Sequence, residues 1–373
     1  MAHITSNMLL HRFRQLQLGA TSQSNDRQPS DETGFDDGFY RPTPIDIIVT
    51  RIMLMRSIKL PADLVDAVFD YAEYWAHSTN VIDYQAEHQD SLRIVGSSPE
   101  EDKFLLRSYP VGLTGIEGGT SLAKELAYDT REAKPLPRNI DCDPTYFAKM
   151  AKYPTPRLLN PVRKVVFTIK SHDQGWSNRD DSAGTYKASS TWFEAGLERF
   201  DAEQTCNAQC TRDVRQELAE SKPPALPVCG IRPVHPKIRS KRSSENAQNL
   251  DNTAYAGDDE THMHGNANNA YDEDEYEYIH PLEGQPEWEI QRNRTATREW
   301  QEKAVTWSYL DDVKANSDAG KALDDEGRGR ATGDGSFVRN LRMGDVVTVW
   351  GKARFPSWVN SVDYVKIDVY WAV

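Results

Sequence analysis

The sequence is poor in cysteine and contains no long apolar run. Its cysteines are too few and too unevenly spread for a disulfide framework, which is typical of a reducing compartment. No apolar stretch reaches the roughly 18 residues that a membrane-spanning helix needs. The first twenty residues also lack the apolar core and the small-residue cleavage site of a secretory signal. The sequence therefore predicts a protein that is not secreted, binds no membrane and resides in the cytoplasm, the nucleus or both.

Apolar residues are scarce as well. They make up 38% of the 373 residues, below the roughly 45–50% of typical globular chains. This composition predicts one folded domain with long irregular insertions, because polar segments cannot offset the entropy of their own ordering. The net charge of −13 argues against binding nucleic acid through its phosphates.

The clearest structural pattern lies between residues 344 and 373. Residues 345–352 and 362–372 alternate apolar and polar side chains and are rich in Val, Ile, Tyr and Trp, which is typical of half-buried strands. Between them, residues 355–360 break the alternation with a proline and two aromatics, which predicts a loop. We expect the last strand to lie in the middle of a sheet.

Similar patterns at residues 162–171, 185–199, 288–292, 303–310 and 337–341 bring the total to about six to eight short strands. This spacing predicts a mainly β protein: an antiparallel, jelly-roll-like β-sandwich with a small N-terminal helical segment and a long disordered insertion. The predicted boundaries are a disordered arm (1–43), a helical segment (44–100), an irregular connection (101–160), the sandwich (161–200 plus 285–373) and a disordered insertion (201–284).

Two aromatic loops give the candidate ligand site. Trp176 and Trp358 lie in loops that a sandwich can bring to one rim, where such rings commonly stack on sugars or peptides. The alternative is that both rings cap the ends of the core. Trp192, Trp350 and Trp371 are predicted to lie in the core itself. The candidate rim residues are His172, Asp173, Trp176, Asn178, Arg354, Phe355, Trp358 and Asn360.

Residues 60–75 predict an amphipathic helix, with Pro61 in its first turn and an apolar stripe along one face. The opening Leu-Pro, the following acidic residue and the Leu-Val pair resemble the first helix of an F-box over residues 58–75, which implies docking on a Skp1-type adaptor of ubiquitin ligases. The alternative is that the helix packs on the main domain. The candidate docking residues are Leu60, Pro61, Leu64, Val65 and Phe69.

A second resemblance covers about residues 160–200 and 286–373. The segments VRKVVFTIKSHDQGWS, GTYKASSTWFEAGLERF, WEIQRNR and GDVVTVWGKARFPSWVNSVDYVKIDVYWAV are similar to a β-sandwich domain of uncharacterised filamentous-fungal proteins, sometimes attached to F-box-like segments. The resemblance implies a fold and a fungal origin, but no activity.

No catalytic or metal-binding pattern stands out. His172 and Asp173 are adjacent in an extended segment and point to opposite sides, so they do not form one catalytic pair. Cys206 and Cys210 lie far from His262 and His264, and His-Met-His is poor zinc-ligand spacing. The Gly-rich segments near residues 327–335 follow no predicted strand and open no helix. We therefore predict neither catalysis, metal nor cofactor.

A short basic run lies inside the predicted insertion. Lys237, Arg239, Lys241 and Arg242 resemble a monopartite nuclear import signal.

Together these features predict a non-enzymatic interaction protein: a β-sandwich binding module with an N-terminal docking helix. The alternatives are an F-box-type substrate receptor of a Skp1-containing ubiquitin ligase and a lectin-like, carbohydrate-binding sandwich. The expected partner is accordingly a protein, which for the F-box alternative is a Skp1-like adaptor, or a carbohydrate.

Overall fold

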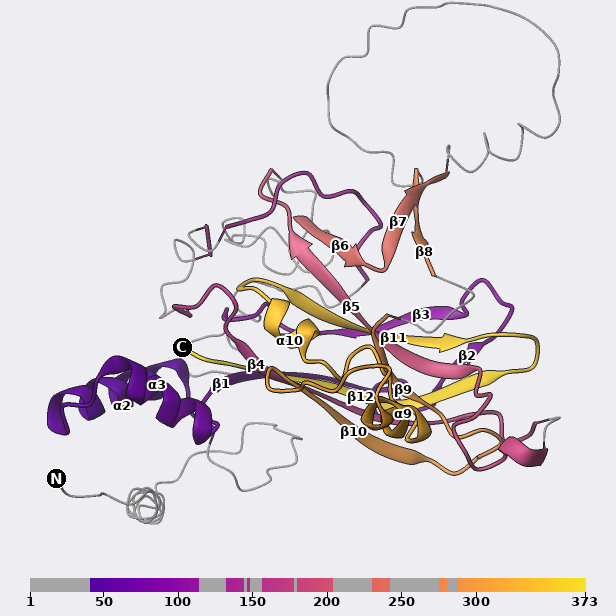
Figure 1. The fold of residues 1–373 in the computed structure, drawn as a ribbon. Helices are drawn as coiled ribbons and strands as arrows, with labels where there is room; N and C mark the ends of the chain where they lie inside the picture. Colours follow the sequence, from indigo (N-terminus) through magenta and orange to yellow (C-terminus); the bar gives the residue numbers. More distant parts are fainter. Residues whose placement is uncertain are drawn as a thin grey trace, which may run out of the picture. The chain divides into compact units, whose positions relative to one another are not determined.

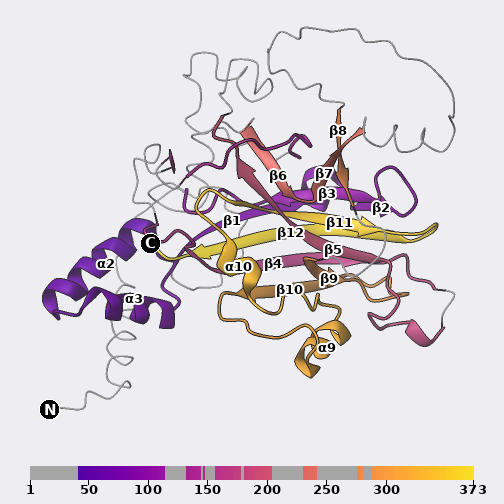
Figure 2. The same ribbon diagram turned by 45° about the horizontal axis from the view of Figure 1, so that its top comes forward.

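Two antiparallel β-sheets pack face to face, and the N-terminal helices α2 (Pro44–Ser57) and α3 (Ala62–Tyr71) lie at one end of them (Figures 1 and 2). The architecture comes from a computed structural model. It describes residues 41–113, 132–143, 146–147, 156–177, 180–203, 230–241, 275–280 and 287–373. The mainly β, sandwich-like fold with N-terminal helices is thereby confirmed, whereas the jelly-roll connectivity stays a prediction.

Sheet A has the strand order β1-β12-β4-β10, and β2 also pairs with β12. The expected central position of the last strand is confirmed, because β12 pairs with β1 on one side and with β4 on the other. The strands are β1 (Ala76–Asp83), β2 (Leu92–Val95), β4 (Val162–His172), β10 (Gln301–Ser308) and β12 (Val359–Trp371).

Sheet B has the order β3-β11-β5-β6, and β9 also pairs with β5. A separate two-stranded ribbon joins β7 to β8. The strands are β3 (Asp102–Arg107), β5 (Thr191–Phe200), β6 (Ile231–His235), β7 (Lys237–Ser240), β8 (Tyr276–Ile279), β9 (Glu289–Arg292) and β11 (Val346–Ala353).

The main core lies between the two sheets. Alternate residues of each strand point inward, as the period of two requires. The inward residues include Val165, Phe167 and Ile169 of β4, Val365, Ile367 and Val369 of β12, Phe193, Ala195 and Leu197 of β5, and Val347 and Val349 of β11. Trp371 belongs to this core, as predicted.

The outer face of sheet B is also covered. Trp350 follows Val349 and therefore points away from the main core, but it is only 2% exposed because Phe104 and Tyr278 pack edge-on against its ring. Trp350, predicted to lie in the core, is therefore buried, but on the outer face of sheet B and not between the two sheets. Trp192 is only half-buried, so its assignment to the core is wrong; its ring lies under the Arg354 guanidinium.

The N-terminal helices begin where local chemistry allows. Helix α2 (Pro44–Ser57) starts with a capping box between Thr43 and Asp46, and Pro44 sits in its first turn. Helix α3 (Ala62–Tyr71) buries Val65 and Phe69. The other helices in the part of the chain that the structure describes include α4 (Tyr84–His88), a 3-10 helix (Asp180–Ser182), α9 (Asp318–Asp325) and α10 (Ser336–Asn340). No helix among the described residues is long and apolar enough to span a membrane.

Several predicted segments need correction. The helical segment 44–100 also contains β1 and β2, and the irregular connection 101–160 contains β3. The insertion predicted to be disordered contains β6, β7 and β8. Edge strand β6 tolerates Pro233, because a proline at a sheet edge need not lose a ladder hydrogen bond. Residues 337–341, predicted as a strand, lie in and just after α10, whose Phe337 packs on Trp307.

Candidate functional site

The two predicted loops lie side by side at one end of sheet A. Ser361 of β12 pairs with His172 of β4, which sets the start of β12 beside the end of β4. The backbone N–H of Val359 donates a hydrogen bond of 3.3 Å to the Gln174 side-chain oxygen. The sequence-based expectation that the loops share a rim therefore agrees with the strand register.

Four aromatic residues gather at this end, and we call them the aromatic rim: Trp176, Trp300, Phe355 and Trp358. Trp176 is 46% exposed, Trp300 41% and Phe355 64%, whereas Trp358 is half-buried. Sequence reasoning missed Trp300. A signal was available, because Trp300 directly precedes a strand that pairs antiparallel with the strand ending at His172. The Trp300 and His172 ring centroids are 4.3 Å apart.

Three candidate rim residues are buried instead of facing solvent. The Asp173 carboxylate is fully buried and accepts hydrogen bonds from the backbone N–H groups of Gly175 (2.8 Å), Ala296 (2.6 Å) and Thr297 (2.8 Å). Burial raises the pKa of Asp173, although these three donors act in the opposite direction. Asp173 thus ties the Trp176 loop to the segment before Trp300.

Asn360 and Arg354 are committed to similar internal contacts. The Asn360 amide donates to the carbonyl oxygens of Lys352 (3.2 Å) and Trp192 (3.3 Å) and accepts from Asn293 (2.8 Å). The Arg354 guanidinium donates to Asp102 at 2.6 Å. These residues support the rim from below, so their predicted role as direct ligand contacts is wrong. Asn178 lies outside the described residues.

Gly175 makes room for a rim residue that the sequence did not reveal. Its φ of +80° is a conformation that glycine adopts easily, and a Cβ there would lie 1.8 Å from Cγ of Arg298. The Arg298 stem therefore rests on the Trp176 loop. This places a cationic side chain beside the aromatic rim.

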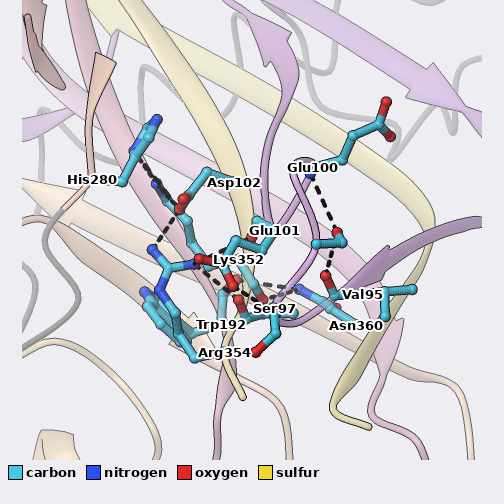
Figure 3. A network of polar contacts seen from close by, with 12 residues as sticks. Val95, Ser97, Glu100, Glu101, Asp102, Trp192, His280, Lys352, Arg354 and Asn360 are labelled. Carbon is cyan, nitrogen blue, oxygen red and sulfur yellow. Dashed lines mark hydrogen bonds and ion pairs between the residues drawn. The ribbon is translucent and has the colours of Figure 1, made fainter. Parts of the chain in front are cut away.

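A buried charge network lies on the outer face of sheet B, next to the rim (Figure 3). Lys352 is fully buried, and its Nζ lies 2.8 Å from Asp102 Oδ1 and 3.8 Å from Glu194 Oε2. It also contacts Nδ1 of His280, just after β8. The network therefore joins β3, β5 and β11 to the segment that covers them.

The charges in this network are mutually dependent. Burial lowers the pKa of Lys352, against the opposing effect of Glu194 and Asp102. Burial favours protonation of Asp102, but the charge of Lys352 and hydrogen bonds from Lys352 and Arg354 outweigh it, so the pKa of Asp102 is lowered. Burial and the Lys352 charge lower the pKa of His280 to about 3. His280 is thus neutral near pH 7 and accepts a hydrogen bond from the Lys352 ammonium. The ammonium stays paired with Asp102, and the contacts together link the strands.

The lowered pKa of His280 predicts a pH effect on stability. An unfolded histidine takes up a proton below pH 6.5, whereas the folded one resists it until about pH 3. This contribution to stability is therefore present above pH 6.5 and is lost as the pH falls toward 3. Between pH 7 and 5 we expect wild type to lose about 2 kcal/mol more unfolding free energy than His280→Gln.

Urea unfolding at pH 7, 6 and 5 measures this difference. Glu289 acts in the opposite direction, because burial raises its pKa to about 7, so only the difference between wild type and variant is informative. Parallel pH profiles for the two proteins would contradict the prediction.

A cavity of about 200 Å³ is lined by both apolar and charged residues. Phe147, Phe200 and Met343 line it, with Asp141, Cys142 and Arg342 nearby. Burial, together with Asp201 and Asp141, raises the pKa of the Cys142 thiol to about 11. Cys142 therefore stays a thiol near neutral pH, which makes it a poor nucleophile.

The cysteine and histidine pairs weighed as zinc ligands, Cys206 with Cys210 and His262 with His264, lie outside the described residues. Within the described ranges, no three His, Cys, Asp or Glu side chains come together as potential metal ligands.

The candidate docking residues of α3 are divided between core and surface. Val65 is fully buried and Phe69 is 4% exposed in the main core, and Leu60 packs against it. Leu64 is 54% exposed and Pro61 is exposed. The Asp70 carboxylate also accepts from Arg163 of β4 at 2.9 Å. Val65 and Phe69 are therefore unavailable to an adaptor, and the helix packs on the main domain.

Neighbouring residues test this structural role of α3. We expect Val65→Ala to lower the unfolding free energy by about 2 kcal/mol, because it leaves a cavity in the core. Leu64→Ala removes more carbon atoms but from the surface, so we expect a change within about 0.5 kcal/mol. Urea denaturation of both variants checks the pair, and equal effects would contradict this orientation of the helix.

The basic run lies partly in a strand. Lys237 and Arg239 belong to β7, Lys241 follows it, and Arg242 lies outside the described residues. Arg239 is ion-paired with Glu277 of β8 at 2.6 Å. The run is thus not a freely extended segment, and its role as an import signal stays a prediction.

Neither resemblance noted in the sequence gains support from known proteins. The two sheets, the aromatic rim and the buried charge network are therefore interpreted from their own geometry. Comparison of this chain with protein-family models, with curated proteins and with solved structures finds no match.

Proposed function

We propose that the protein is a non-enzymatic binding module, a jelly-roll-like β-sandwich that binds an extended segment of a partner protein at the aromatic rim. The observation that carries this proposal is the exposure of Trp176, Trp300 and Phe355, each between 41% and 64%, at one end of sheet A. Clusters of exposed apolar side chains commonly mark interaction sites, and Trp and Phe are enriched in them.

The rim is held in place before any partner binds. Asp173 fixes the Trp176 loop, and the backbone N–H of Gly96 donates to the Trp358 carbonyl at 2.9 Å. Fixed loops lose little conformational entropy on binding, which favours affinity.

Polar groups beside the rings suit a peptide. Lys170 lies over the Trp300 ring at 5.9 Å and is 39% exposed along its side chain. Its ammonium is paired with Asp363 at 2.6 Å, and an ammonium has three N–H donors. The remaining donors, together with those of Arg298, suit peptide carbonyls while the rings contact apolar side chains. Helix α3 serves as part of the scaffold.

A carbohydrate ligand is the second candidate. Exposed tryptophan rings with polar neighbours also stack on sugar faces. The exposed Trp176 and Trp300 rings favour this alternative.

Selection of peptides from a random library on the immobilised full-length chain, followed by calorimetry, tests the proposal. We expect Trp176→Ala and Phe355→Ala each to weaken binding of a selected peptide by at least about tenfold, the loss typical of an interface hot spot. Leu310→Ala is the matched control. Leu310 is an apolar residue that is 71% exposed, but it follows the end of β10 that is away from the rim. The Leu310→Ala variant should bind the selected peptide with the affinity of wild type.

A glycan array probed with the same proteins separates the two candidates. If no peptide is selected and the wild type binds a glycan that Trp176→Ala does not bind, the ligand of the rim is a sugar and not a peptide. Peptide binding that survives both rim substitutions would contradict the proposed site.

A further inference from the structure

Helix α2 is apolar on both of its faces. Ile47 is 1% exposed and, together with Ile48 and Leu54, contacts the main core. Other apolar side chains of the helix, and Ile58 just after it, are 37–59% exposed: Ile45, Val49, Ile52, Met53, Met55 and Ile58. A cluster of exposed apolar side chains commonly marks a surface that another chain covers.

Ile52 lies in the middle of the exposed stripe. Val49 and Met55 lie three residues before and after it, and Ile45 lies near the start of the helix. Residues three or four apart share one side of a helix, so Ile45, Val49, Ile52 and Met55 form a stripe. Reversing the direction of the helix leaves such a stripe nearly unchanged.

Charge has the complementary pattern. The first turn of α2 carries the acidic Asp46 and the last turn carries the basic Arg56. When two such helices lie antiparallel, the last turn of each faces the first turn of the other. Each Arg56 then lies near the partner's acidic end.

We propose that α2 pairs antiparallel with α2 of a second copy of this chain, across a two-fold axis at Ile52. A two-fold interface uses the same patch on both subunits, which a palindromic stripe with opposite charges at its ends satisfies. The six side chains form an apolar patch on the order of 500 Å². Two such patches approach the lower limit of specific interfaces, about 1,200 Å² in total, so the dimer is weak, with a dissociation constant on the order of 1–100 μM.

The proposal is tested by light scattering and sedimentation of the full chain at about 1–500 μM. This range brackets the expected dissociation constant of the dimer. Wild type should shift from monomer to dimer. Ile52→Glu, which sets two carboxylates against each other at the axis, should weaken the dimer at least about a hundredfold. Val81→Glu is the control. Val81 is as exposed as Ile52, at 43% against 44%, but it lies on β1 and not on α2. The Val81→Glu variant should dimerise as wild type does.

Mixing two variants tests the axis itself. Ile52→Glu and Ile52→Lys should each be monomeric alone, whereas their mixture should form a heterodimer because opposite charges meet at the axis. Met55→Glu gives a second route to a monomer should Ile52→Glu fold poorly. A wild type that stays monomeric, or a mixture that stays monomeric, would overturn the proposal, as would a monomer that binds a different protein through Ile52.

Discussion

Lys352→Met is expected to lower the free energy of unfolding by about 3–5 kcal/mol, because it leaves buried carboxylates without their cation. Lys352 is fully buried, and its ammonium lies 5.4 Å from the centroid of the Trp350 ring; methionine removes this charge but has a side chain of similar length. Asp102 keeps Arg354 and Glu194 keeps the Trp192 indole N–H at 2.6 Å, which favours the lower end of this range. Urea denaturation at pH 7 measures the loss.

The control is Lys103→Met on the same sheet. Lys103 pairs with Glu100, and their side chains are 38% and 72% exposed, so we expect a change within about 0.5 kcal/mol. Adding Glu194→Gln to Lys352→Met should recover part of the loss, because it removes one uncompensated charge. A Lys352→Met variant within about 1 kcal/mol of wild type would show that the network adds little to stability.

Asp173→Ala is expected to cost about 3–4 kcal/mol of unfolding free energy and to abolish ligand binding at the aromatic rim. The substitution removes the acceptor of three backbone N–H groups at 2.6–2.8 Å, and each donor left unsatisfied in a buried site costs about 1–3 kcal/mol. The Trp176 loop would then lose its link to the segment before Trp300. Urea denaturation gives the stability and calorimetry with a selected peptide gives the binding.

Asp173→Asn separates these contributions. Its side-chain oxygen can still accept from Gly175 and Thr297, whereas its amide group cannot accept from Ala296. We expect a loss intermediate between wild type and Asp173→Ala, with rim binding largely kept. Full binding by Asp173→Ala would contradict a role for Asp173 in ordering the rim.

Strand patterns predicted strands of both main sheets where apolar residues recur at every second position. Strands β4 and β12 bury every second residue over long runs, and that period is visible in sequence. Strands β6, β7 and β8 were missed because each has only four or five residues and sits among polar segments. Their pairing depends on partners distant in the chain, which a local pattern does not reveal.

The site was predicted only in outline. The aromatic loops stood out by composition, but sequence alone gave no sign that Asp173, Arg354 and Asn360 point inward. A polar residue on alternate strand positions normally faces water, so Glu194 and Lys352 gave no sign of burial either. Glu194 and Lys352 are shielded from water by residues distant in the chain, such as Tyr278 and His280, that pack on the outer face of sheet B.

The central position of β12 has a consequence for biosynthesis. Strand β1 finds its partner far along the chain, as Thr79 and Asp368 show, which are hydrogen-bonded although 289 residues apart. Until β12 leaves the ribosome, β1 lacks its partner strand and β4 keeps one unpaired edge, because β4 otherwise pairs only with β10. Such edges invite association between nascent chains. We therefore expect this chain to fold late and slowly, and to rely on chaperones during its translation.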